Sequence, residues 1–208
     1  MSALLPYRCV QGLGRRRVLA LLVLPVAVLA LALLPASAPA AKRTVTLTFD
    51  ELSFVPVNGV TIDGLTFGFT GGDATYGAFG PGTIVNVQDP SLEGSSAGTL
   101  TLSFARPTNV LEFGLALSTF GSLTPGATVA LYNPGGHLRT TIPLNTDSIV
   151  SYTEGRFAYA GGAIGSAVIT FDPTAGRFAL DNLTFEQKGV PRRQTFATSS
   201  ARATAWPR

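Results

Sequence analysis

Apolar residues recur at every second position between residues 44 and 186, in short runs separated by Gly, Pro, Asn and Asp. Three clear runs are Leu65, Phe67 and Phe69; Leu100, Leu102 and Phe104; and Leu111, Phe113, Leu115 and Leu117. This alternation is typical of half-buried strands, and no stretch after residue 42 keeps a helical period for long. Because strands with one apolar face must bury it, the sequence predicts an all-β fold. We expect an antiparallel two-sheet β-sandwich of jelly-roll type over 42–187, with an immunoglobulin-like sandwich as the alternative.

The alternation changes phase at two places. It shifts across 50–51 in the first predicted strand and across 181–182 in the last. A change of phase within a strand indicates an extra residue, that is, a β-bulge. The first predicted bulge places Leu52 and Phe54 on the inward face beyond it.

The two predicted bulges carry acidic or amide side chains, which makes them a candidate metal site. The residues concerned are Asp50, Glu51, Asp181 and Asn182. If the first and last strands are neighbours, these oxygens converge, and such ligands suit a hard cation such as Ca²⁺ in a structural role. The alternative hypothesis is that each pair ends its strand and faces water.

The N-terminal 40 residues have the layout of a secretory signal. A basic segment, 1–17, precedes the apolar run 18–34, and small residues follow up to Ala40. We predict a signal peptide over 1–40, cleaved after Ala40, and therefore a periplasmic, cell-surface or extracellular location. An uncleaved membrane anchor is the alternative, although Pro25 interrupts the short apolar run. After cleavage no membrane span is expected.

The C-terminal segment 188–208 shows neither period and is predicted to be a disordered basic tail. It contains Trp206, the only tryptophan of the chain. The only cysteine, Cys9, lies in the predicted signal peptide. The mature domain is therefore expected to have no disulfide, no thiolate metal site and no cysteine nucleophile.

The net charge of +3 comes from the two ends of the chain. Segment 42–187 contains six basic residues against all 12 acidic ones, a net charge of −6. A negative domain repels phosphate backbones, so nucleic acid is excluded as a partner.

The glycine-rich stretch 71–82 is the candidate binding loop. It places Asp73, Tyr76 and Phe79 on one long connection, and ligand contacts often lie on loops. An exposed Tyr beside an acid can stack on a sugar face and accept hydrogen bonds from hydroxyl groups. The alternative is that Tyr76 and Phe79 fold back to cap one end of the sandwich.

Catalytic chemistry finds little support in the sequence. His137 is the only histidine, and its Asn-Pro-Gly-Gly-His context indicates a turn. Asp89 and Glu93 share a loop, but their spacing specifies no glycosidase geometry. We therefore predict a non-enzymatic protein.

The predicted domain opens with TVTLTFDEL and closes with FALDNLTFE, which contains Asp181 and Asn182. These two segments resemble the ends of exported bacterial β-sandwich proteins of the PEP-CTERM type, and Asp181 and Asn182 match the last strand of that family. Val190 and Pro191 stand where the sorting motif begins, but two arginines follow in place of Glu-Pro. The resemblance implies a surface or extracellular-matrix role without its sorting tail.

A more distant resemblance is to jelly-roll carbohydrate-binding modules, whose terminal strands often hold a structural calcium ion. It implies Asp50, Glu51 and Asp181 as calcium ligands, whereas the predicted domain lacks the tryptophan that such modules use to bind sugars.

Three functions remain open after these arguments. The first is a surface or matrix protein that binds a polysaccharide. The second is a structural or assembly module that binds a surface protein. The third is a polysaccharide-acting hydrolase.

Overall fold

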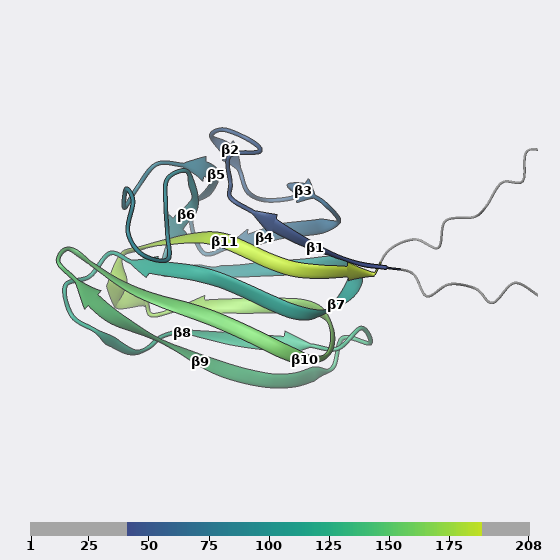
Figure 1. The fold of residues 1–208 in the computed structure, drawn as a ribbon. Coiled ribbons are helices and arrows are strands. Elements are labelled where there is room, and N and C mark those ends of the chain that lie inside the picture. Colours follow the sequence, from purple (N-terminus) through teal and green to yellow (C-terminus); the bar gives the residue numbers. More distant parts are fainter. Residues whose placement is uncertain (1–40, 189–208) are drawn as a thin grey trace, which may run out of the picture. The chain divides into compact units, whose positions relative to one another are not determined.

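The computed structural model describes residues 41–188, so the predicted signal peptide and nearly all of the predicted tail lie outside the described residues. Figure 1 shows the strands, which are β1 Lys42–Leu47, β2 Val55–Pro56, β3 Thr61–Ile62, β4 Leu65–Thr70, β5 Ala74–Ala78, β6 Ser91–Ser95, β7 Thr99–Leu117, β8 Leu123–Tyr132, β9 Leu138–Ile149, β10 Tyr152–Phe171 and β11 Arg177–Lys188. The helical element described is a single 3-10 turn, η1, at Pro173–Ala175. Within 41–188 no helix is long and apolar enough to cross a membrane.

All strand pairs are antiparallel, and they form two facing layers. The first layer contains β3, β4, segment 99–104 of β7, segment 166–171 of β10, β8 and β9. The second contains β2, β5, β6, β11, segment 111–117 of β7 and segment 153–160 of β10, with β1 added to β11. The predicted all-β sandwich of jelly-roll type is confirmed.

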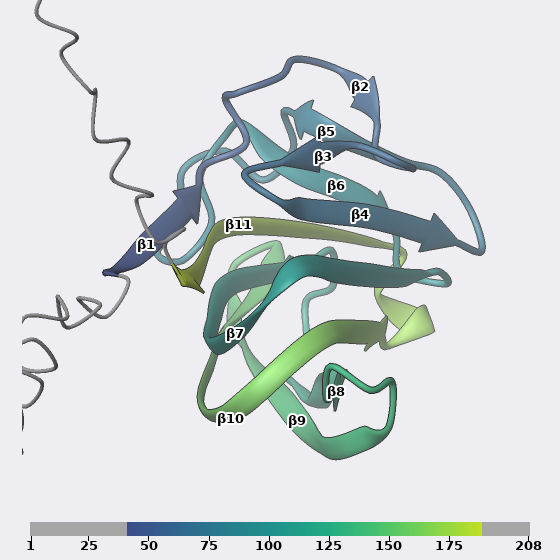
Figure 2. The same ribbon diagram turned by 90° about the vertical axis from the view of Figure 1, so that its right-hand side faces the viewer.

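The two layers are continuous because β7 and β10 run side by side and belong to both (Figures 1 and 2). Their register shifts between Ala160 and Ser166, where the pair bends from one layer into the other. Such irregularities bend a strand and increase its twist. One long hairpin therefore connects the two layers.

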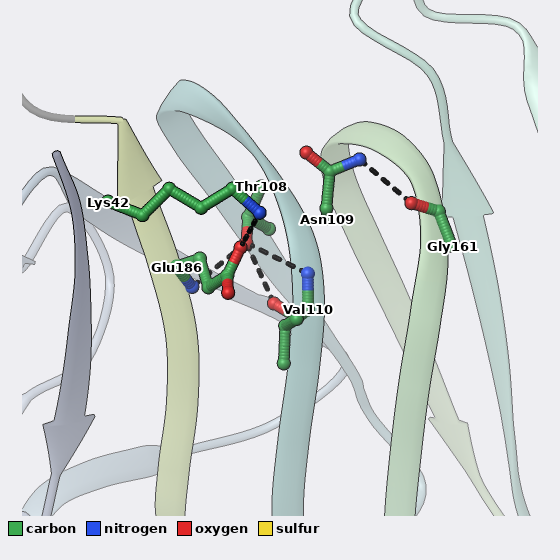
Figure 3. Close-up of polar contacts among 6 residues, drawn as sticks. All are labelled: Lys42, Thr108, Asn109, Val110, Gly161 and Glu186. Atoms are coloured by element: carbon green, nitrogen blue, oxygen red, sulfur yellow. Dashed lines mark hydrogen bonds and ion pairs between the residues drawn. The ribbon is translucent and has the colours of Figure 1, made fainter. Parts of the chain in front are cut away.

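Polar side chains fasten this bend (Figure 3). The buried Thr108 hydroxyl donates to the carbonyl of Val110 at 2.8 Å and accepts the backbone N–H of Glu186 at 3.0 Å. The Asn109 amide donates to the carbonyl of Gly161 at 2.8 Å. These bonds satisfy groups that the interrupted strand pairing leaves free.

The core lies between the layers and contains the predicted inward residues of the alternating runs. Aromatic rings meet across it: Phe69 lies 5.7 Å from Phe178, and Phe104 lies 5.5 Å from Phe185. Phe171 stacks on Phe178 with ring centroids 4.0 Å apart. Because each pair joins the two layers, burial of these rings holds the sandwich together.

The two predicted bulges have different outcomes. Asn182 adopts a positive φ of 54°, and the register of β11 with β7 shifts between Asp181 and Thr184, so this bulge is confirmed. The bulge in the first strand is wrong, because β1 ends at Leu47. Leu52 and Phe54 follow in a loop and are 39% and 62% exposed, so they do not point inward.

Candidate functional site

Residues 79–90, here called the strap, connect β5 to β6 and cross the outer face of the second layer. Ile84 and Val87 of the strap pack on Ala116 of β7 and Ala179 of β11. Both alanines are buried although they point away from the core. The strap therefore forms a fixed part of the outer face.

A buried carboxylate holds the middle of the strap. Glu154 of β10 is 4% exposed and accepts the backbone N–H groups of Val85, Asn86 and Val87 at 3.2, 2.9 and 3.2 Å. Three donors around one carboxylate compensate for its removal from water. The strap also passes close to Gly114, where a Cβ atom would lie 2.0 Å from the Asn86 carbonyl oxygen.

A second carboxylate, that of Asp181 in the β11 bulge, holds the end of the strap. It accepts the backbone N–H of Gln88 at 2.9 Å and that of Asn182 at 2.6 Å. Burial raises the pKa of Asp181 to about 6, and the negative charges of Glu51 and Asp50 add to the rise, while the two hydrogen bonds oppose it. Asp181 therefore fixes the end of the strap to β11.

The outer face is hollowed on one side of the strap. This Glu93 hollow has a volume of about 210 Å³. It is lined by Gly80, Pro81, Glu93, Ala116, Ser118, Tyr152, Arg177, Phe178 and Ala179. The lining combines apolar surface with a carboxyl, a guanidinium, a phenol and a hydroxyl group, which suits a small ligand that has both apolar and polar faces.

Glu93 supplies the buried charge of this hollow. It is 8% exposed, and its carboxylate accepts the hydroxyl of Ser91 at 3.3 Å. Burial raises the pKa of Glu93, and the Arg177 guanidinium opposes the rise. Arg177 also pairs with Asp73 at 3.8 Å. The carboxyl group can therefore accept hydrogen bonds when ionised or donate one when protonated.

A second hollow, the Arg156 hollow, lies where the strap passes over Gly114 and has a volume of about 280 Å³. It is lined by Thr46, Val85, Asn86, Glu112, Phe113, Gly114, Arg156, Asn182 and Thr184. Arg156 Nη2 lies 2.6 Å from Glu112 Oε2. The two hollows share no lining residue.

The structure separates the three predicted ligand-binding residues. Asp73 is exposed and pairs with Arg177 at the Glu93 hollow. The prediction that Tyr76 is an exposed stacking residue is wrong, because Tyr76 is 0% exposed and its hydroxyl donates to Glu51 at 2.5 Å. Phe79 is 61% exposed, and its ring lies 5.6 Å from that of Phe54. The capping alternative thus holds for Tyr76 but not for Phe79.

The predicted metal ligands lie near one another, since Asp50 and Glu51 raise the pKa of Asp181 through their charges. Glu51 already accepts the Tyr76 hydroxyl, and Asp50 accepts the Thr48 hydroxyl at 2.8 Å. Within residues 41–188, no three His, Cys, Asp or Glu side chains are close enough together to hold a metal ion. Calcium binding by these residues and Asn182 stays a prediction.

The role of Glu154 and the hollow at Glu93 were not found from the sequence. Both residues stand at outward positions, where a charged side chain is ordinarily solvated. The strap buries them, and its path depends on contacts distant in the chain. His137 is exposed in a turn closed by Asn133, as expected.

No protein-family model matches the chain, and no curated protein matches it. A family 29 carbohydrate-binding module from Piromyces equi is 11% identical, with 72% of this chain and 92% of that one covered and a TM-score of 0.44. A second structure of a family 29 carbohydrate-binding module is 9% identical, with coverages of 72% and 90% and a TM-score of 0.41. The enzymatically active domain of tailspike protein 4 of bacteriophage CBA120 is 17% identical, with coverages of 62% and 21% and a TM-score of 0.36.

Proposed function

We propose that this protein is an exported, non-enzymatic glycan-binding protein of the cell surface or extracellular matrix. One sugar unit of a polysaccharide occupies the Glu93 hollow. The observation that carries this proposal is the combination, in one open hollow, of a mostly buried carboxyl group with an arginine, a tyrosine and an apolar floor.

The chemistry of the hollow complements a sugar ring. Each sugar hydroxyl both donates and accepts, so Glu93 offers an acceptor while Arg177 and Ser118 offer donors. The partly buried ring of Tyr152 and the side chain of Ala179 offer apolar surface to the C–H face of the ring. Desolvated polar groups discriminate strongly, because a ligand without a matching hydroxyl leaves Glu93 with only the Ser91 hydroxyl and the Arg177 charge as partners.

The second carboxylate near Glu93, that of Asp89, already accepts hydrogen bonds from the backbone, which favours binding over hydrolysis. Asp89 raises the pKa of Glu93 through its charge, so the two groups are neighbours. The oxygens of Asp89 accept the backbone N–H groups of Gly80 and Gly82, each at 3.1 Å. Asp89 is thus committed to the strap and is a poor nucleophile or base.

A second candidate function is assembly with a protein partner. The exposed rings of Phe54 and Phe79 lie 5.6 Å apart and form an apolar spot outside both hollows. Phe120, 78% exposed, is another such residue. A non-enzymatic assembly module would show concentration-dependent self-association that Phe79→Ser abolishes, and no affinity for any glycan.

The test is a polysaccharide array probed with the full chain, with and without calcium, followed by calorimetric titration of the best-bound glycan. We expect Tyr152→Ala and Arg177→Ala to weaken binding at least about tenfold, since each removes a contact to the sugar. His137→Ala, at an exposed turn, serves as the control and leaves the affinity unchanged. No binding to any polysaccharide would overturn the proposal, and binding that both hollow variants retain would overturn the assigned site.

A further inference from the structure

The Arg156 hollow is built from polar groups that come from five separate parts of the chain. Thr46 is on β1, Glu112 on β7, Arg156 on β10, Thr184 on β11 and Asn86 in the strap. Strand pairing fixes four of these positions: Thr184 is opposite both Glu112 and Thr46, and Arg156 is opposite Gly114, which also lines the hollow. The hollow is therefore preformed.

Its charges cancel. The lining contains one cation, Arg156, and one anion, Glu112, in contact at 2.6 Å. Their side chains are 66% and 34% exposed, so both present unused polar atoms to the hollow. An anionic ligand would have to compete with Glu112 for the guanidinium within a domain of net negative charge, which disfavours it.

The uncharged polar side chains of the hollow are held by hydrogen bonds that leave some of their donors and acceptors available to a ligand. The Asn182 amide nitrogen donates to the Asn86 carbonyl oxygen at 3.2 Å and to Asp181 at 3.1 Å, which turns its side-chain oxygen to other partners. The hydroxyls of Thr46 and Thr184 lie 2.9 Å apart and share one hydrogen bond. Fixed donors and acceptors bind a ligand at little cost in side-chain entropy.

The apolar part of the hollow is small. Phe113 belongs to the lining, but its ring is 1% exposed and stacks on Phe157 in the core. Val85, 77% exposed, offers an aliphatic surface from the strap. The hollow has no exposed aromatic ring on which a flat ligand can stack, so hydrogen bonds must supply the recognition.

From this arrangement we infer that the Arg156 hollow is a second binding site, which takes a neutral ligand bearing adjacent hydroxyl groups, such as an uncharged sugar unit. One hydroxyl accepts from Arg156 while its neighbour donates to Glu112, and the amide oxygen of Asn182 accepts a further hydroxyl. The site goes beyond the proposed function, because it shares no lining residue with the Glu93 hollow.

The test is an NMR titration of the full chain with hexasaccharides of glucose, mannose and xylose, and separately with a galacturonate hexasaccharide. We expect at least one neutral hexasaccharide to shift the Arg156 Nε–H resonance and the side-chain amide resonances of Asn86 and Asn182. Arg156→Ala and Glu112→Gln should each lower the affinity at least about tenfold, as followed by the side-chain amide resonances of Asn86 and Asn182. Arg139→Ala, an arginine on β9 that is also exposed, is the matched control and should have no effect.

Three outcomes would overturn the inference: no neutral saccharide shifts these resonances, only the galacturonate does, or both hollow variants bind as the unchanged chain does. The dispersion of the amide spectrum of each variant verifies that it is folded. Failure here is distinguishable from failure of the proposed function, because occupancy of the Glu93 hollow moves the resonances of Ala116 and Ala179 and is weakened by Tyr152→Ala. That variant should leave the Arg156 hollow unaffected.

Discussion

The carboxylate of Glu154, on β10, accepts the backbone N–H of Asn86, in the strap, at 2.9 Å. The same carboxylate accepts the N–H groups of Val85 and Val87, so it organises the backbone of three successive residues. The strap thereby separates the outer face into two hollows of different character. Both proposed binding sites depend on this anchoring, because strap residues contribute to each.

Removal of the anchor should destabilise the domain. In Glu154→Ala three backbone N–H groups lose a charged acceptor under a strap that is partly shielded from water. Hydrogen bonds to charged groups contribute about 1.5–3 kcal/mol each, and an unpaired donor adds a penalty. We expect the free energy of unfolding in urea to fall by about 3 kcal/mol, less than the sum because the freed strap can gain water.

The control for this loss is His137→Ala, at an exposed position in the turn that precedes β9. Its free energy of unfolding should stay within about 0.5 kcal/mol of the unchanged chain. Equal effects of the two substitutions would contradict the anchoring role of Glu154.

Gly114 should tolerate no side chain. A Cβ atom there would lie 2.0 Å from the carbonyl oxygen of Asn86, which is backbone and cannot rotate away. Gly114→Ala must displace either the strap or β7, and overpacking of this kind costs about 1–3 kcal/mol. Thermal unfolding measures the loss. Gly121→Ala is the matched control, since a Cβ atom at Gly121 would meet nothing within 4 Å, and a comparable loss there would refute the explanation.

The pKa of Asp181 predicts how stability depends on pH. Because burial raises this pKa from 3.8 to about 6, the folded protein binds the proton more tightly than the unfolded chain. The resulting stabilisation is present in full below the unfolded pKa of 3.8 and is lost as the pH rises through about 6. Asp181→Asn keeps an oxygen acceptor for the N–H of Gln88 but carries no charge at any pH.

The difference in free energy of unfolding, Asp181→Asn minus the unchanged chain, should therefore be about 2 kcal/mol more positive at pH 7 than at pH 4. Urea unfolding of both proteins at the two pH values measures this difference, and the titration of Glu93 and other groups cancels in the comparison. A difference that does not change with pH would show that Asp181 titrates normally.

The alternation of apolar residues predicted the fold because each strand buries one face. Phe178 and Leu180 were predicted to point inward and both are buried. The alternation gave a wrong prediction for the residues after Phe49, because Phe49 has a positive φ of 61° and the chain continues there as a loop. A change of phase in the sequence does not distinguish a bulge, as at Asn182, from the end of a strand.

The candidate site was less accessible from the sequence, since it depends on the strap. The predicted loop 71–82 contributes Gly80 and Pro81 to the Glu93 hollow. Tyr76, however, follows the alternation of β5 into the core, where its hydroxyl reaches Glu51. No local pattern indicates that the strap folds back over β7 and β11, because the contacts that hold it join residues about seventy to ninety positions apart.

Hydrogen exchange of the full chain with and without saturating amounts of the best-bound glycan tests the central claim most directly. The account predicts slower backbone exchange in the strap, 79–90, and in segment 177–180 beside the Glu93 hollow, with no change in the turn around His137. Protection confined to the loop around Phe54, or no protection with any glycan, would contradict it.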